Sequence, residues 1–350
     1  MLFVDDDFLE LGFAVFADVF VDWHWYGPRN GLLDDYSRID GLPFGRNLEN
    51  RLAAARRLFH YSHPKPQIFE NAMGKSVWPL PSDGRLADIA GGRKGMDRVL
   101  GLGRFFFAIS MVGFGVQYMV YGRYLGGLPP VPPWTPGGAF GAYLTGAVLI
   151  VAGVSILANW KARLSATVVG LLFLFCVLLL HTQRLSAVLN NGNDRTRALE
   201  PLALAGAAFM LAATLAVDWP NSRGWNAAVA WLSKLGRWLF AGSMVIFGVQ
   251  HFMYAGFIAT LVTPWIPGHL FWVYVTGVGM IVAGLCIATK KLGGLAATWL
   301  GIMFLLWVIV LHGPRVTAQL RNADELSSLL VALAMGGASF VVAQALKKDH

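Results

Sequence analysis

The chain has 350 residues, of which 56% are hydrophobic and 14% are charged, and its mean hydropathy is +0.54. This composition excludes an ordinary soluble globular protein and indicates a membrane protein. The formal net charge of +8 comes largely from basic residues in short loops between apolar segments. There it predicts membrane topology, and no nucleic-acid partner is expected.

Residues 1–95 differ from the rest of the chain. They begin with an acidic run and contain an aromatic cluster, and no helical or strand period follows, so no fold is predicted for them. One interpretation is that the native chain begins at Met96; the alternative is a genuine N-terminal segment. His60 and His63 lack a nearby cysteine or carboxylate cluster and are interpreted as surface histidines, so no metal site is expected.

Eight apolar segments follow. Each is close to the length of about 20 residues that spans the ~30 Å core of a bilayer. We expect transmembrane helices at about 104–122, 138–158, 163–181, 200–217, 237–257, 269–289, 295–312 and 326–346. The predicted fold class is therefore all-α, a polytopic membrane protein with eight transmembrane helices.

The stretch from Leu102 to Arg184 occurs twice, and its second copy begins at Leu235. Apolar segments, turn residues and several polar residues recur in the same order, which indicates an internal repeat. We divide the chain into the N-terminal segment 1–95, a first four-helix repeat 96–217, a linker 218–234 and a second four-helix repeat 235–350. Because each repeat has an even number of helices, the two bundles are expected to enter the membrane in the same direction, parallel to one another.

The loops predict the orientation in the membrane. Lys and Arg are more frequent in the loops on the side that also holds both ends of the helical region. The positive-inside rule therefore places both termini in the cytoplasm, and we expect a multi-pass protein of the bacterial cytoplasmic (inner) membrane. On this side, Arg104 and Arg237 are expected to contact lipid head groups.

The polar residues that recur in both repeats fall on one face of each helix. The predicted topology brings the ends of the first and third helices, a Pro-Trp loop and the start of the second helix to the outer side. One polar cluster per repeat is expected there. The candidate ligand-binding residues are Gln117, Tyr121, Trp134, Tyr143, His181 and Arg184 in the first repeat, and Gln250, Tyr254, Trp265, Tyr274, His312 and Arg315 in the second.

These clusters have two interpretations. Amide, imidazole, phenol and guanidinium groups suit a quinone carbonyl, a lipid head group or an anion, and His is the group that would handle a proton. In the other interpretation, Gln and Tyr form hydrogen bonds between helices, His and Arg lie at the water interface, and Trp anchors the loop. Haem ligation by His181 and His312 is disfavoured, because the pseudo-symmetry would hold these histidines far apart. No residue is assigned a catalytic role.

The motifs in their order resemble the DoxX-like family of four-helix membrane proteins. They are Gln-x-x-x-Tyr on the first helix, a Pro-Trp-x-Pro-Gly loop, Tyr-x-x-Gly and Val-Ala-Gly on the second helix, and a His that ends the third. The resemblance covers 102–217 and again 235–346, so the chain looks like a tandem DoxX-like protein. It implies a four-helix bundle per repeat and relatives linked to thiosulfate:quinone chemistry, terminal oxidases and oxidative-stress complexes, and more distantly to surfeit-type cargo receptors.

The chain departs from the thiol-redox members of that family. Its two cysteines, Cys176 and Cys286, both fall in apolar segments and form no C-x-x-C motif, so dithiol chemistry is not expected.

Three functions remain open. The first hypothesis is an inner-membrane subunit that binds a quinone or lipid on the outer side and works with a redox partner protein. The second is a non-catalytic scaffold or receptor-like protein. A small-solute transporter ranks third, since no carboxylate is expected inside a transmembrane helix. The carboxylates after residue 104 were placed in or beside loops, and they include Asp194, Glu200, Asp218, Asp324 and Glu325.

Overall fold

The computed structural model describes residues 83–123, 138–181, 188, 190–217, 220–319 and 321–348, without the side chains of residues 83–100, 138, 180, 181 and 348. The expectations for His60, His63, Trp134, Arg184 and Asp218 lie outside the described residues. So does nearly all of the segment 1–95.

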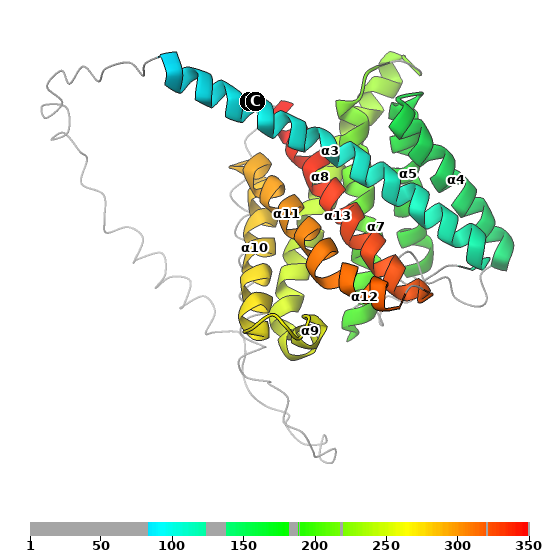
Figure 1. Cartoon of the computed structure of the whole chain (residues 1–350). Helices are drawn as coiled ribbons and strands as arrows, with labels where there is room; N and C mark the ends of the chain where they lie inside the picture. Colours follow the sequence, from blue (N-terminus) through cyan, green and yellow to red (C-terminus); the bar gives the residue numbers. More distant parts are fainter. Residues whose placement is uncertain are drawn as a thin grey trace, which may run out of the picture. The chain divides into compact units, whose positions relative to one another are not determined.

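The described residues form helices, and no strand occurs among them. In chain order they are α3 (Asp83–Tyr121), α4 (Gly138–Ala158), α5 (Ala162–Cys176), η1 (Val177–His181), α7 (Gly192–Thr214), α8 (Arg223–Met253), α9 (Ala255–Leu261), α10 (His269–Thr289), α11 (Gly293–Trp307), η3 (Val308–His312), α12 (Gly313–Ala318) and α13 (Ala323–Lys348) (Figure 1).

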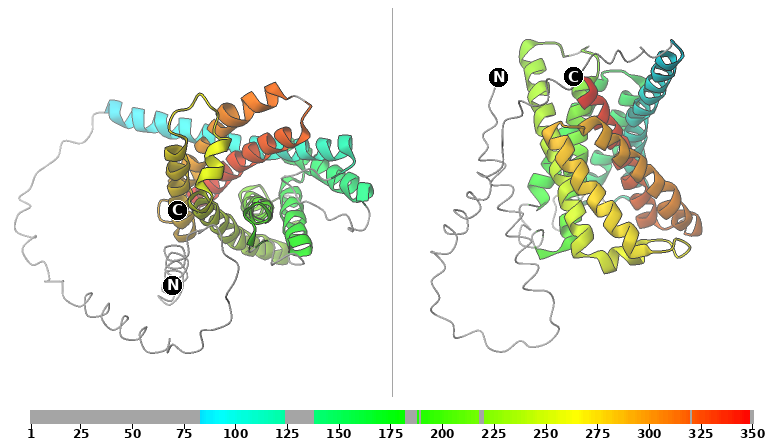
Figure 2. Two further views of the ribbon diagram at one scale, coloured as in Figure 1. Left: turned by 90° about the horizontal axis from the view of Figure 1, so that it is seen from below. Right: turned by 90° about the vertical axis from the view of Figure 1, so that its left-hand side faces the viewer.

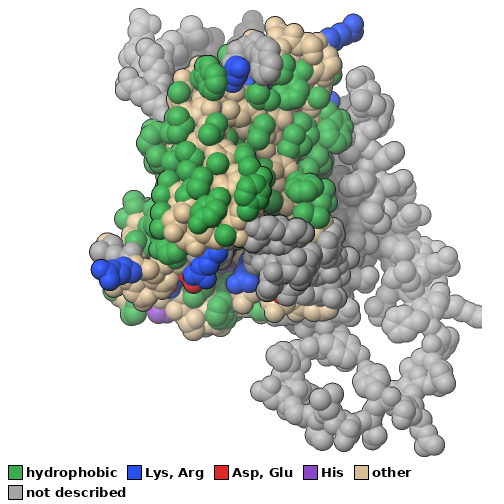
Figure 3. Space-filling view, turned by 90° about the vertical axis from the view of Figure 1, so that its right-hand side faces the viewer, with side chains coloured by type: hydrophobic (Ala, Val, Ile, Leu, Met, Phe, Trp, Pro, Cys, Tyr) green, Lys and Arg blue, Asp and Glu red, His purple; other side chains and the backbone are tan. Residues whose placement is uncertain are grey.

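Seven of the spans in these described ranges are long and apolar enough to cross a membrane by themselves. An eighth exists only if α8 and α9 count together, and that pair is bent by 96°. Apolar side chains cover much of one face of the helices, and Lys and Arg side chains lie toward its two ends (Figure 3). This is an all-α, multi-pass membrane protein.

Three helices begin earlier than the sequence predicts. Helix α3 begins at Asp83 and runs through Met96, so the expected boundary at residue 95 lies inside a helix. Helix α8 begins at Arg223, within the expected linker, because the Ser222 side chain caps it by accepting the Trp225 backbone N–H at 3.2 Å.

Helix α7 begins at Gly192 because Asn191 is its N-cap. The Asn191 side chain accepts the backbone N–H groups of Asn193 at 2.9 Å and Asp194 at 3.4 Å. Asn, Ser and Asp favour this position, since their side chains satisfy amides that the first turn leaves unpaired. Residue 200, expected at the start of this helix, therefore lies about two turns inside it.

The helices of the two predicted repeats interlock. Neighbours in sequence pack in order: α3 on α4, α4 on α5 and α5 on α7, and likewise α8 on α10, α10 on α11 and α11 on α13 (Figures 1 and 2). In addition, α7 packs on α8, α13 packs on α3, and α7 packs on α13. The last long helix of each repeat thus packs on the first helix of the other, which differs from two self-contained four-helix bundles.

Glycines make this exchange of partners sterically feasible. Gly206 of α7 and Gly236 of α8 face each other so closely that a Cβ at either would collide with the other's carbonyl oxygen. At the corresponding crossing, a Cβ on Gly103 of α3 would lie 2.6 Å from the Cβ of Phe340 and 3.0 Å from the Gly337 oxygen of α13. Small residues allow helix backbones in membranes to approach and pack closely, which stabilises their association.

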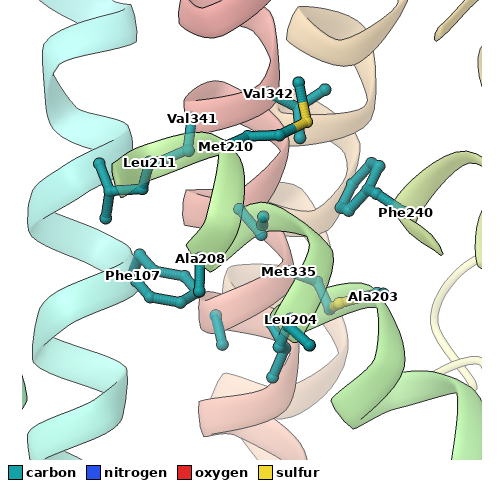
Figure 4. Close-up of a cluster of buried hydrophobic side chains, with 14 of the residues drawn as sticks. Phe107, Ala203, Leu204, Ala208, Met210, Leu211, Phe240, Met335, Val341 and Val342 are labelled. Carbon is teal, nitrogen blue, oxygen red and sulfur yellow. The ribbon is translucent and has the colours of Figure 1, made fainter. Parts of the chain in front are cut away.

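Helices α7 and α13 form the centre of the fold. In an apolar 18-residue stretch of each, 72% and 78% of the residues are buried, against 50% or less in the other five spans. Both carry many alanines, and larger side chains enter from outside, among them Phe107 of α3 and Phe240 of α8 (Figure 4). The exposed faces of the outer helices are left for lipid.

The glycine crossing yields a stability prediction. The substitution Gly236→Ala is expected to lower the free energy of unfolding by about 1–3 kcal/mol, because overpacking would force two backbones apart. The measurement is thermal unfolding in detergent. Gly242→Ala is the control, since a Cβ at that position of the same helix meets no atom within 4 Å. Equal stability of the two variants would contradict the close crossing.

Candidate functional site

Gln117 joins the first helix of one predicted repeat to the last helix of the other. Its side chain is 3% exposed. Its Nε2 donates to the Ala323 carbonyl at 3.2 Å, and its Oε1 accepts the Ser327 hydroxyl at 3.1 Å. Both partners lie near the start of α13. Gln117 therefore fastens α3 to α13.

Gln250 makes the corresponding contact in the second repeat. Its Nε2 donates to the Gly192 carbonyl at 3.0 Å and to Thr196 Oγ1 at 3.3 Å, which ties α8 to the start of α7. The Tyr254 ring covers the same Gly192, where a Cβ would lie 2.6 Å from a ring carbon. The Oε1 atom of Gln117 accepts a hydrogen bond, whereas the Oε1 atom of Gln250 is buried without a hydrogen-bond partner among the described residues.

The first predicted cluster is described only in part. Trp134 and Arg184 lie outside the described residues, and so does the side chain of His181, although its backbone ends the π-helical turn η1. Tyr121 and Tyr143 are exposed. The Tyr143 hydroxyl lies against Gly122, which ends α3 with a positive φ of 58°.

Members of the second predicted cluster contact different neighbours. Trp265 is exposed, and Tyr274 stacks on Phe252 with 5.4 Å between ring centroids. The Arg315 guanidinium donates to the carbonyl of Leu261, the last residue of α9. The contacts thus bring Gln250 and Tyr254 together at the start of α7, while Arg315 joins α12 to α9.

His312 lies where the helix geometry changes. It ends η3, in which the Gly313 N–H bonds to the Val308 carbonyl five residues earlier. Such π-helical turns are rare and often occur at functional sites. The Nδ1 atom of His312 is buried and has no hydrogen-bond partner among the described residues. Most buried polar atoms in proteins are paired, so this one calls for an explanation such as a ligand or water.

The elements around η3 hold an aromatic pair and a second unpaired polar group. Trp307 lies about one π-helical turn before His312 and stacks on His251, with 6.2 Å between ring centroids and an interplanar angle of 21°. Thr263 follows Leu261 by two residues, and its Oγ1 is likewise buried without a partner in the described part of the chain. We call His251, Thr263, Trp307, His312 and Arg315 the His312 corner.

Sequence reasoning missed several of these residues. Ser327 and Thr196 occupy matching positions in the two repeats, so their hydroxyl groups were a usable signal, but each cluster was assembled within one repeat. Thr263 gave no such signal, because its counterpart is Pro132. The counterparts of His251 and Trp307 in the first repeat are Tyr118 and Cys176, so the imidazole and the indole do not recur there.

The position of Glu200 differs from the sequence prediction, which places it beside a loop. Glu200 lies within α7, one turn after Arg197, and its side chain is partly buried. The expectation that no carboxylate lies inside a transmembrane helix is therefore wrong. Its counterpart in α13 is Val331, so comparing the repeats gave no indication of it. Asp194 lies in the first turn of α7, and Asp324 and Glu325 lie in the first turn of α13, near helix ends.

A cavity of about 330 Å³ lies at the other end of α7, away from Gly192. Its wall includes Arg104, Asn159, Leu211, Thr214, Leu215 and Gln344. Arg104 Nε donates to the Ile156 carbonyl near the end of α4 at 2.8 Å, and Arg237 Nη1 donates in the same way to the Ala288 carbonyl near the end of α10 at 2.8 Å. Each arginine thus caps the C-terminal end of a neighbouring helix.

Cys176 and Cys286 are both free and partly buried. Within the ranges that the structure describes, no three His, Cys, Asp or Glu side chains are grouped in a way that could hold a metal ion.

Comparisons with protein-family models, with curated proteins and with solved structures find no match. The resemblance to the DoxX-like family therefore remains a prediction from the sequence motifs.

The two glutamine contacts yield a second stability prediction. Gln117→Ala is expected to lower the free energy of unfolding by about 0.6–1.7 kcal/mol, the range measured for hydrogen bonds between membrane helices. Thermal unfolding in detergent measures it. Ser328→Ala is the control, because this exposed hydroxyl bonds only within α13, to the Asp324 carbonyl. An unchanged melting temperature for Gln117→Ala would show that the residue does not fasten α3 to α13.

Proposed function

We propose that this chain is a DoxX-like protein of the bacterial inner membrane that binds a quinone, or an amphiphile with a similar carbonyl-bearing ring, at the His312 corner. The proposal includes eight spans in two tandem repeats, with α8 and α9 together forming one span and both termini in the cytoplasm. It replaces the two symmetric outer clusters by one site in the second repeat.

The observation that carries the proposal is the buried, unpartnered Nδ1 atom of His312. In the tautomer with a proton on this nitrogen, His312 is a donor for a ring carbonyl, and the choice of tautomer is part of the proposal. The Thr263 hydroxyl is a second unpaired group close in sequence to the carbonyl that Arg315 holds.

Ring contacts support the same ligand class. Trp307 and His251 offer a stacked aromatic surface within about one helical turn of His312, and quinone rings are flat and apolar on their faces. Ligand sites combine such apolar walls with a few polar groups that fix orientation. We assign no catalytic residue, and in this proposal a redox partner protein exchanges electrons with the bound ring.

A second function, the scaffold, is favoured by a different observation. Gln117 and Gln250 are recurring polar residues, and both bond helix to helix. If the remaining recurring residues act in the same way, the protein has no small-molecule ligand, and its outer surfaces serve to dock a protein partner.

The two functions predict different results on purification. Protein in mild detergent is extracted and analysed for quinone by mass spectrometry, with a visible spectrum recorded first. We expect about one quinone per chain, and His312→Leu is expected to lower retention about tenfold, the equivalent of one lost hydrogen bond of ~1.4 kcal/mol.

His269→Leu is the matched control for that experiment. His269 is also a partly buried histidine of the second repeat, at the first position of α10 and outside the His312 corner. Its substitution is expected to leave quinone content unchanged. Folded wild-type protein that carries bulk phospholipid and no quinone would reject the quinone proposal and favour the scaffold.

A further inference from the structure

The cavity beside Arg104 is a separate site, because it lies at the Thr214 end of α7, whereas Gln250 and the outer residues meet the Gly192 end. Three helices contribute to its wall: α3 through Arg104, α7 through Leu211 and Thr214, and α13 through Gln344. It therefore forms only when the two predicted repeats interlock.

Arg104 is a fixed cation on one side of the cavity. Its Nε and Nη2 atoms both donate to the Ile156 carbonyl, which holds the guanidinium plane in place. Its Nη1 atom makes no hydrogen bond within the part of the chain that the structure describes. Its Nη2 atom also donates to the Leu157 carbonyl at 3.5 Å. A guanidinium that is held in this way and keeps its Nη1 donors is preorganised for an anionic oxygen, and phosphate is a preferred partner of Arg.

The C-terminal end of α7 also lines the cavity and has the other polarity. Helix α7 ends at Thr214; the Leu211 carbonyl accepts the Leu215 N–H at 3.2 Å, and the carbonyl groups that follow it have no amide partner within the helix. The C-terminal end of a helix carries a partial negative charge, which attracts cations. The Thr214 hydroxyl donates its proton to the Leu211 carbonyl at 2.8 Å. A purely anionic ligand would be poorly matched to this side.

We propose that this cavity binds the head group of a phospholipid that carries both a phosphate and a primary ammonium group. The phosphate lies against Arg104 and the ammonium group faces the C-terminal end of α7. The volume of about 330 Å³ is at the lower end of ligand-pocket sizes, so it suits a head group whose acyl chains stay in the bilayer. The side-chain amides of Asn159 and Gln344 add donors for the phosphate oxygens.

The second repeat supplies a built-in comparison. Arg237 caps the end of α10 as Arg104 caps the end of α4. However, the counterparts of Thr214 and Gln344 there are Ala345 and Ala213, which offer no polar side-chain group. Removing either arginine therefore removes an equivalent helix cap, but only Arg104 faces the polar cavity. The two variants separate a binding role from a structural one.

The experiment uses the full chain in nanodiscs that contain equal amounts of phosphatidylethanolamine and phosphatidylglycerol. Lipid that remains bound after transfer to detergent is counted by native mass spectrometry. We expect one retained phosphatidylethanolamine per chain. Arg104→Gln is expected to reduce its retention about tenfold, the effect of a lost charge-assisted contact. Arg237→Gln is expected to leave lipid retention unchanged and to lower the melting temperature as much as Arg104→Gln does.

Other outcomes would overturn the proposal. Equal retention of both lipids would remove the role of the ammonium group, and equal loss in the two arginine variants would show that only the helix caps matter. Displacement of the lipid by millimolar inorganic phosphate would identify a free-anion site instead. If Arg104→Gln fails to fold, Gln344→Ala tests the same cavity from α13, and unchanged lipid retention in that variant would contradict the site. The quinone content of the same preparations reports independently on the His312 corner.

Discussion

The fold depends on backbone contact between helices that belong to different predicted repeats. Gly206 packs against Gly236, and Gly337 packs against Gly103, so closely that a Cβ on any of them would collide with the facing helix. In a bilayer, burial of apolar surface does not by itself drive helices together, so close packing and hydrogen bonds must do so. The glycines allow the close packing. The hydrogen bonds come from Gln117 and Gln250, which bond near the starts of α13 and α7. The cavity beside Arg104, which α3, α7 and α13 line together, depends on this central arrangement.

The sequence predicted the helices well because each depends on a local property. Apolar length found the spans, although the third helix of the second repeat continues beyond His312 into α12. Helix starts were predicted less well. The N-caps Asn191 and Ser222 begin α7 and α8 within polar stretches, which hydropathy alone assigns to loops. The sequence did not predict which helices pack on each other, because a recurring glycine indicates that another helix approaches closely without identifying that helix.

The candidate residues were chosen because they recur in both predicted repeats, and this choice explains their roles in the structure. Recurrence in both repeats selects positions that the shared packing needs, and Gln117 and Gln250 are of this kind. Groups that differ between the repeats were passed over, yet Thr263, Glu200 and the polar wall formed by Thr214 and Gln344 all belong to this class. Recurrence thus pointed to the helix-fastening glutamines and to His312, whereas polar groups present at only one of two matching positions became apparent only in the structure.

The interlocking also has a consequence for how such a protein assembles. A chain with only one repeat would leave its first helix without the α13-type partner, and a second chain would have to supply it by exchanging its last helix. That association would depend on protein concentration in the membrane. Joining the repeats through residues 218–234 makes it intramolecular, which replaces a bimolecular equilibrium by a high effective concentration. It also frees each half to change independently, so a polar group such as Thr214 or Gln344 can occur at only one of two matching positions.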